Sequence, residues 1–175
     1  MRITVIGHAG SGKSTLAAAL SKKVGVPHIQ LDRLWFEAGG HALRKDDAAG
    51  KERVRTFIRE RVEEAIRQDA WVSDGWYPRV QPMIAERADL VVFLDVPLWR
   101  RLLNHIRRAV VERGRRHAEV THWDDVTFLW RIVRRTWTQD DAMRAFVRDR
   151  ASKAVVLRTR VEMDAFRRQF LKEKE

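Results

Sequence analysis

The 175-residue sequence contains no cysteine. This absence excludes disulfide scaffolds, zinc sites built on thiolates and enzymes with a cysteine nucleophile. No apolar run approaches the ~20 residues that a membrane-spanning helix needs. The first residues lead directly into an apolar segment, without the pattern of a signal or transit peptide. We therefore expect a cytoplasmic protein with no membrane segment.

Internal repeats and low-complexity linkers are also missing from the sequence. The length is that of one ordinary domain with a sizeable core, and we expect residues 1–175 to form a single domain. The segment 37–50 has glycines among charged residues, which predicts a mobile loop.

Lysine is absent from one long segment, although the chain carries a net charge of +11. Between Leu98 and Arg150 there are 13 arginines and no lysine. Such a surplus is typical of proteins that bind nucleic acid, an acidic membrane surface or a small polyanionic substrate. The alternative is an arginine-rich composition that has no functional meaning.

The strongest motif is the glycine-rich segment Gly7–Ser14, which follows an apolar strand-like run and precedes a helix-like run. Its glycines let consecutive backbone N–H groups turn toward a phosphate, and the helix start adds unpaired donors. Lys13 would supply positive charge to the β- and γ-phosphates, and Ser14 a hydroxyl for Mg²⁺. The alternative is a glycine turn that only caps a helix. The residues expected to bind ATP are Gly7, Gly10, Ser11, Gly12, Lys13, Ser14 and Thr15.

Apolar runs and helical periodicity alternate along the chain, which predicts a parallel sheet with helices on both faces. The predicted fold class is α/β: a three-layer α/β/α P-loop NTPase with a five-stranded parallel sheet and a helical lid insert at about 97–151, built of two or three helices. We expect strands at 3–6, 27–31, 70–73, 89–94 and 153–157, and further helices at 14–24, 51–68, 79–87 and 161–172.

Two aspartates follow predicted strands, where ligands of parallel sheets bind. Asp74 comes after the third strand and would hold Mg²⁺ directly or through water; the alternative is a simple Asp-Gly turn. Asp32 ends the second strand and would orient an acceptor hydroxyl or take its proton. Its alternative role is to cap a short helix.

Other residues near these strand ends are candidates for binding the acceptor. Trp35 and Trp76 follow strands two and three and would line its pocket. Arg79 would clamp an acceptor phosphate. Within the insert, Arg115 and Arg116 lie near the expected lid tip and would reach the transferring phosphate on closure. The alternative for such arginines is a solvated helix face.

Several segments together resemble the small P-loop kinases related to adenylate kinases, including the group known as DNA topology modulation proteins. The likeness extends along essentially the whole chain, and Asp74–Arg79 is similar to the Asp-Gly-Phe-Pro-Arg signature of adenylate kinases. The other segments that show this resemblance are Gly7–Ser14, Leu31–Trp35, Trp71–Gly75, Asp89–Pro97, Arg113–His117 and Val156–Arg160.

The resemblance implies a kinase that binds ATP with Mg²⁺ and transfers the γ-phosphoryl group to a small acceptor. It also implies that Arg108 contacts the nucleotide phosphates. Two positions depart from the related pattern: Asn104 stands where that pattern has arginine, and no Gly-Asp turn follows Asp32.

We therefore expect an ATP-dependent phosphotransferase whose acceptor is a small molecule, with a nucleotide among the candidates. One alternative is an ATP-binding protein associated with nucleic acid, although the sequence has no helix-turn-helix or zinc module. Another is a P-loop ATPase that uses water in place of an acceptor.

Overall fold

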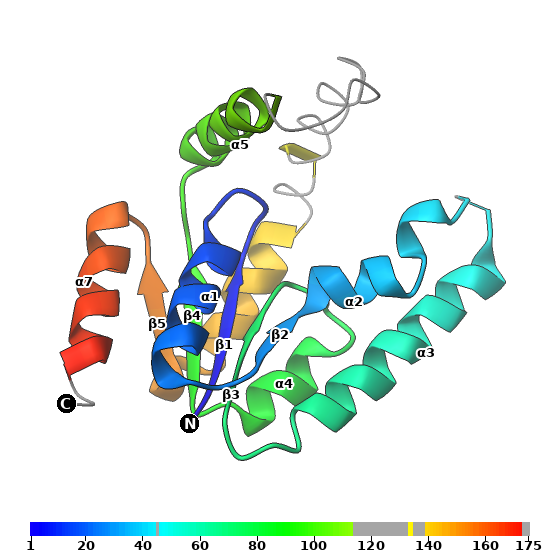
Figure 1. The fold of residues 1–175 in the computed structure, drawn as a ribbon, viewed down its shortest axis with the longest axis horizontal. Helices are drawn as coiled ribbons and strands as arrows, with labels where there is room; N and C mark the ends of the chain where they lie inside the picture. The colour runs from blue at the N-terminus through cyan, green and yellow to red at the C-terminus, as the bar shows by residue number, and fades with distance from the viewer. Residues whose placement is uncertain (45, 114–132, 135–138, 173–175) are drawn as a thin grey trace.

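The computed structural model describes residues 1–44, 46–113, 133–134 and 139–172 (Figure 1). Its centre is a five-stranded parallel sheet with the strand order β2-β3-β1-β4-β5. The strands are β1 (Arg2–Gly7), β2 (His28–Gln30), β3 (Trp71–Asp74), β4 (Leu90–Leu94) and β5 (Ala154–Leu157). The predicted parallel sheet is confirmed.

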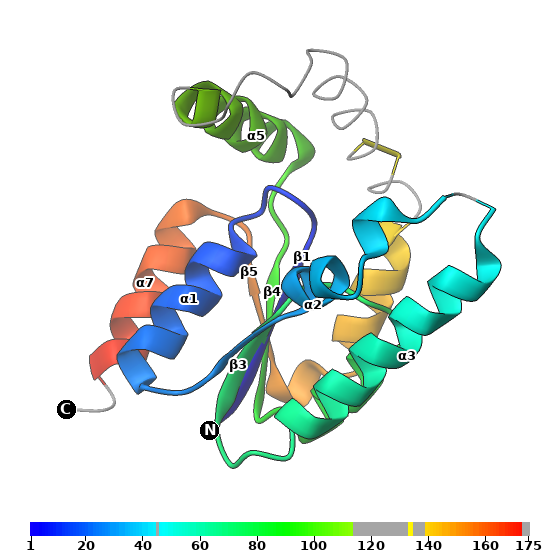
Figure 2. The ribbon, with the colours of Figure 1, turned by 45° about the vertical axis from the view of Figure 1, so that its right-hand side comes forward.

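Helices cover both faces of this sheet (Figure 2). One face is covered by α1 (Lys13–Val24) and α7 (Arg160–Lys172), which lie next to each other. The other face is covered by α3 (Ala48–Ala65), α4 (Gln81–Arg87, labelled in Figure 1) and a helix at 139–148. The three-layer α/β/α prediction is thereby confirmed, while α5 (Leu98–Arg113) lies beyond the end of the sheet.

The alternation of side chains along each strand divides the core between the two faces. Ile3 and Val5 of β1 pack with Leu16 and Leu20 of α1, and all four are buried. Ile6 points to the opposite face, where it joins a cluster that includes Phe93, Met143 and Val147. A third cluster lies between β2, β3 and helices α3 and α4, and it includes Ile29, Trp71, Ile58 and Ile84.

The segment after β2 differs from the prediction. The strand ends at Gln30 rather than at residue 31, and Asp32 lies in the first turn of α2 (Leu31–Glu37) instead of at a strand end. The predicted loop 37–50 contains a short 3₁₀ helix at Gly40–Ala42 and the first residues of α3. That helix begins early because the Asp47 side chain accepts a hydrogen bond of 2.6 Å from the Gly50 N–H, as an N-terminal cap does.

The parallel arrangement brings the segments that follow β1, β2, β3 and β4 to one edge of the sheet. Gly7, Asp74 and Asp95 directly end or follow β1, β3 and β4, and the turn to α2 follows β2. This edge is where ligands of open parallel sheets bind. Among the described residues, no helix has the length and apolar character needed to cross a membrane.

Candidate functional site: a phosphate loop at the sheet edge

The segment between β1 and α1 adopts the conformation of a phosphate-binding loop. Gly10 has φ +78° and Gly12, which caps α1, has φ +91°, and both angles favour glycine. Within the loop the Ser11 N–H donates to the His8 carbonyl at 3.2 Å. Lys13 begins the first turn of α1, so a cation lies at a helix start, where the first backbone N–H groups have no partner within the helix.

The side chains of Ser14 and Asp74 meet beside this loop. The Ser14 hydroxyl donates to Asp74 Oδ2 at 2.5 Å, and the Asp74 side chain is only 4% exposed. A hydroxyl and a carboxylate are the oxygen donors that a small divalent cation takes in phosphate sites. The structure thus brings together the two residues that the sequence nominated for metal binding.

A histidine that the sequence analysis did not select completes the environment of Asp74. His28 of β2 donates from Nε2 to Asp74 Oδ1 at 2.8 Å, and Gln30 contacts His28 Nδ1 at 3.1 Å. The available signal was the alternation of polar residues around Ile29, which places His28 and Gln30 on one face of β2. Their register opposite Val72 and Asp74 of β3 became visible only in the folded sheet.

Helix α5 lies directly over the phosphate loop. The Asn104 side-chain amide donates to the Gly10 carbonyl at 2.9 Å. A Cβ at Gly10 would lie 2.7 Å from the Arg101 carbonyl oxygen and 2.8 Å from the His105 ring. The position where related kinases have arginine therefore holds a residue that contacts the loop backbone.

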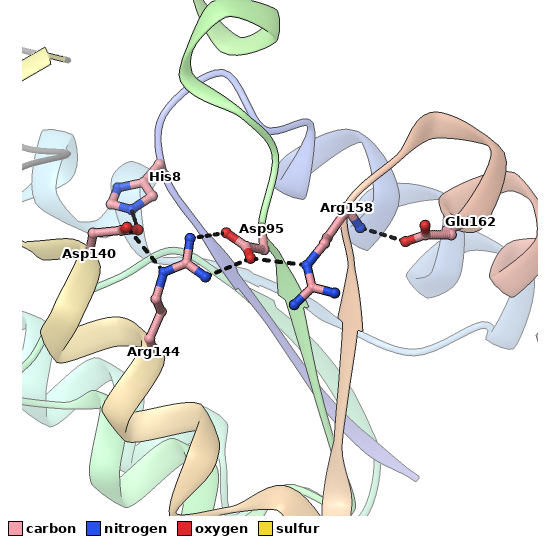
Figure 3. A network of polar contacts seen from close by, with 6 residues as sticks. All are labelled: His8, Asp95, Asp140, Arg144, Arg158 and Glu162. Carbon is pink, nitrogen blue, oxygen red and sulfur yellow. Dashed lines mark hydrogen bonds and ion pairs between the residues drawn. The ribbon is translucent and has the colours of Figure 1, made fainter.

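A series of hydrogen bonds and ion pairs links the loop to the ends of β4 and β5 (Figure 3). His8, in the loop, contacts Asp140 at 3.0 Å, and Asp140 accepts from Arg144 Nε at 3.0 Å. The other two Arg144 nitrogens bind both oxygens of Asp95, at 2.7 and 2.8 Å. Arg158 reaches the same carboxylate at 3.3 Å. Helix 139–148 is thereby attached to both the loop and the sheet.

Burial and hydrogen bonding have opposite effects on the pKa values of His8 and Asp140. Burial lowers the pKa of the His8 imidazole below its ordinary value, although the hydrogen bond to Asp140 opposes this. Burial by itself would raise the pKa of Asp140, but the hydrogen bonds from His8 and Arg144 outweigh it and lower that pKa. Asp140 is therefore held ionised beside a neutral His8 at ordinary pH.

The candidate acceptor residues lie on the side of β2 and β3. Asp32 is exposed and accepts a hydrogen bond of 3.1 Å from the Tyr77 hydroxyl. Trp35 is half-buried, and its indole leaves no room for a Cβ at Gly40. Arg79 is exposed and lies 3.8 Å from the Glu52 carboxylate.

Trp76 has a packing role that the sequence did not indicate. Its ring lies edge-on to Phe146 of helix 139–148, with the ring centroids 5.2 Å apart, at the border of the core cluster around Phe93. The predicted lid residues Arg115 and Arg116 lie outside the described residues. Arg108 belongs to α5, and its side chain is likewise outside the described part of the chain.

Comparisons with known sequences agree with this geometry. A family model described as an AAA domain matches residues 3–74, from β1 to the end of β3. An adenylate kinase of Mycobacterium sp. (strain MCS) is 34% identical over 108 residues, which cover 56% of this chain and 59% of the relative. An adenylate kinase of Thermosynechococcus vestitus (strain NIES-2133 / IAM M-273 / BP-1) is 30% identical over 132 residues, covering 63% of this chain and 68% of the relative. The chain thus matches less than two thirds of the first relative's length.

Solved structures with the same fold include two shikimate kinases. The enzyme from Bacteroides thetaiotaomicron superposes with a TM-score of 0.59 at 18% identity, over 99% of this chain and 98% of its own. The enzyme from Acinetobacter baumannii, solved in complex with shikimate, superposes with a TM-score of 0.59 at 17% identity, over 99% of this chain and 92% of its own. At such identities the likeness is one of fold. From the phosphate loop, the sheet and the sequence relatives together, the chain belongs to the P-loop kinases related to the adenylate kinases.

Proposed function

We propose that this protein binds ATP with Mg²⁺ and transfers the γ-phosphoryl group to a small acceptor. The observation that carries the proposal is the Ser14–Asp74 pair beside the phosphate loop, with 2.5 Å between hydroxyl and carboxylate. A loop of this kind binds polyphosphate, and the neighbouring oxygen donors suit a hard cation.

Different residues would bind the phosphates and the metal during phosphoryl transfer. The loop N–H groups and the Lys13 ammonium would bind the β- and γ-phosphates and stabilise the charge that develops on them. Ser14 and Asp74 would hold Mg²⁺, which supplies further charge neutralisation when bound. Within the described residues no group of three or more histidine or acidic side chains forms a metal cage. Mg²⁺ sites of phosphate-binding proteins use one or two protein ligands together with phosphate and water.

Asp32 would orient the acceptor and take its proton. An acceptor hydroxyl would form a bond from its oxygen to the γ-phosphorus while the bond to the bridging oxygen of ADP breaks. The hydroxyl proton would pass to the Asp32 carboxylate, which Tyr77 holds in place. Trp35 and Arg79 would contact the remainder of the acceptor, and closure of the insert would bring Arg108, Arg115 and Arg116 to the phosphates.

The proposal is tested by following the fate of the γ-phosphate. ATP labelled at that position is incubated with the protein, Mg²⁺ and separate panels of nucleoside monophosphates and small hydroxyl compounds, shikimate included. Label in a new phosphorylated compound supports the proposal and identifies the acceptor class. Release of inorganic phosphate at the same rate with every panel would show an ATPase instead.

A further inference from the structure

Asp74 is a buried carboxylate whose two oxygens have different partners. Oδ2 accepts from the Ser14 hydroxyl and Oδ1 accepts from His28 Nε2, at 2.5 and 2.8 Å. The side chains of Asp74 and His28 are 4% and 12% exposed. Because a buried carboxylate without donors is costly, both contacts matter to where this group points.

Local strand geometry explains why His28 reaches this carboxylate. In the parallel pairing of β2 with β3, His28 lies opposite Val72 and Gln30 lies opposite Asp74. Paired residues point to the same face, and Val72 belongs to the cluster that packs against α1. His28, Gln30 and Asp74 therefore all face α1, the helix that carries Ser14.

Gln30 contacts the ring nitrogen of His28 that faces away from Asp74. The Gln30 side-chain nitrogen is a donor and lies 3.1 Å from His28 Nδ1, so Nδ1 acts as the acceptor. The other ring nitrogen, Nε2, faces Asp74. The three residues form an ordered sequence of hydrogen bonds from the edge strand to the carboxylate.

We propose that His28 is a positioning residue for Asp74, which it holds in the orientation that binds the metal of the metal–ATP complex. This inference rests on the proposed function. Groups that orient a metal ligand typically change metal affinity or activity by about 10- to 100-fold when they are removed. Within the described residues the hydrogen bonds of His28 go to Asp74 and Gln30 and not to the phosphate loop, so we expect its replacement to leave metal-free ATP binding unchanged.

A matched pair of substitutions separates the hydrogen bond from the rest of the side chain. His28→Gln places an amide nitrogen near the former Nε2 position and can still donate to Asp74. His28→Asn has a shorter side chain, whose nitrogen lies near the former Nδ1 position, so Asp74 Oδ1 loses its donor. Both replacements are neutral and polar.

The measurement is calorimetric titration with an ATP analogue whose β- and γ-phosphorus atoms are bridged by nitrogen, in Mg²⁺ and in EDTA. The Mg²⁺-dependent gain in affinity should fall about tenfold or more in His28→Asn and stay within about twofold of wild type in His28→Gln. Affinity in EDTA should be the same in all three proteins.

Other results would overturn the inference. An unchanged gain in His28→Asn, or an equal loss in both variants, would show that the hydrogen bond does not matter. Loss of EDTA affinity in His28→Asn in proportion to the loss in Mg²⁺ would assign His28 a purely structural role. If the wild-type protein itself bound no analogue in either buffer, the proposed function would fail instead.

Discussion

Lys13 lies at the start of α1, half-buried, where its ammonium can reach a phosphate held by the preceding loop. Among the described residues no carboxylate lies within ion-pair distance of it, in contrast to Arg144, whose charge is shared between two aspartates. A cation without a carboxylate partner is available to a ligand anion. The loop and the lysine together therefore provide the positive charge of the site.

We expect Lys13→Ala to lower the rate of phosphoryl transfer by ~10²-fold or more, because a group that stabilises transition-state charge is lost. Label transfer from ATP measures the rate, and thermal unfolding checks that the variant is folded. Lys23→Ala, an exposed change at the other end of α1, is the control and should behave like wild type. A Lys13→Ala protein that turned over ATP normally would contradict the mechanism.

At the scale of elements, the contact between α5 and the phosphate loop sets the geometry of the site. Gly10 allows the α5 backbone to approach until a Cβ would lie 2.7 Å from the Arg101 carbonyl oxygen. Arg101 itself is buried, and burial lowers its pKa while the nearby charges of Asp140 and Asp95 oppose this shift. The loop and α5 are therefore expected to move together.

Gly10→Ala should combine backbone strain with a clash against α5, and so weaken ATP binding as well as stability. Gly39→Ala is the matched control, because Gly39 has a similar φ of +74° and no atom within 4 Å of a Cβ. The control should lose only about 1–2 kcal/mol of unfolding free energy from left-handed strain. Chemical denaturation and ATP calorimetry measure both effects; equal losses in the two variants would mean that the clash is unimportant.

The contact between His8 and Asp140 joins the loop to helix 139–148 and predicts a pH dependence of stability. Because the folded pKa of His8 lies below its unfolded value of 6.5, the unfolded chain takes up a proton first as the pH falls. The free energy of unfolding should therefore decrease as the pH falls below about 6.5. Asp140 adds a second loss at lower pH, as that group becomes protonated below its ordinary value of 3.8.

His8→Gln is the variant that tests this dependence, since glutamine can donate to Asp140 but does not titrate. Denaturation between pH 7.5 and 5.5 should show a smaller decrease in unfolding free energy for the variant than for wild type. The same slope in both proteins would show that other groups cause the pH dependence.

At the scale of the whole molecule, the net charge of +11 raises the question of whether the protein binds nucleic acid. Many of the basic groups are already engaged in ion pairs, as Arg59 is with Glu63 and Arg144 is with Asp95. Binding through phosphate contacts alone depends strongly on salt, since each contact releases counterions.

We expect random-sequence duplex DNA to bind only at low salt, with an affinity that falls by a factor of ~10³ or more between 50 and 200 mM if six or more phosphates are contacted. Fluorescence anisotropy at several salt concentrations measures this dependence. Tight binding that persisted at 200 mM salt would favour a nucleic-acid function over a kinase with a small acceptor.

The sequence by itself determined the phosphate loop, the order of strands and helices along the chain, and Asp74 at a strand end. These features depend on neighbouring residues: glycine spacing, apolar runs and the polar residue that follows a run. The sequence placed Asp32 at the end of a strand, whereas it lies in the first turn of α2. A short apolar run before an aspartate is equally compatible with a strand end and with a helix start.

The tertiary structure decided which distant residues meet. His28 lies 46 residues from Asp74, and His8 lies 132 residues from Asp140. Such pairs depend on strand order and register, which local pattern does not specify, because any parallel order of the five strands would bury the same apolar residues. The loop motif could be recognised before folding, but the groups that hold it and its metal carboxylate in place are a property of the assembled sheet.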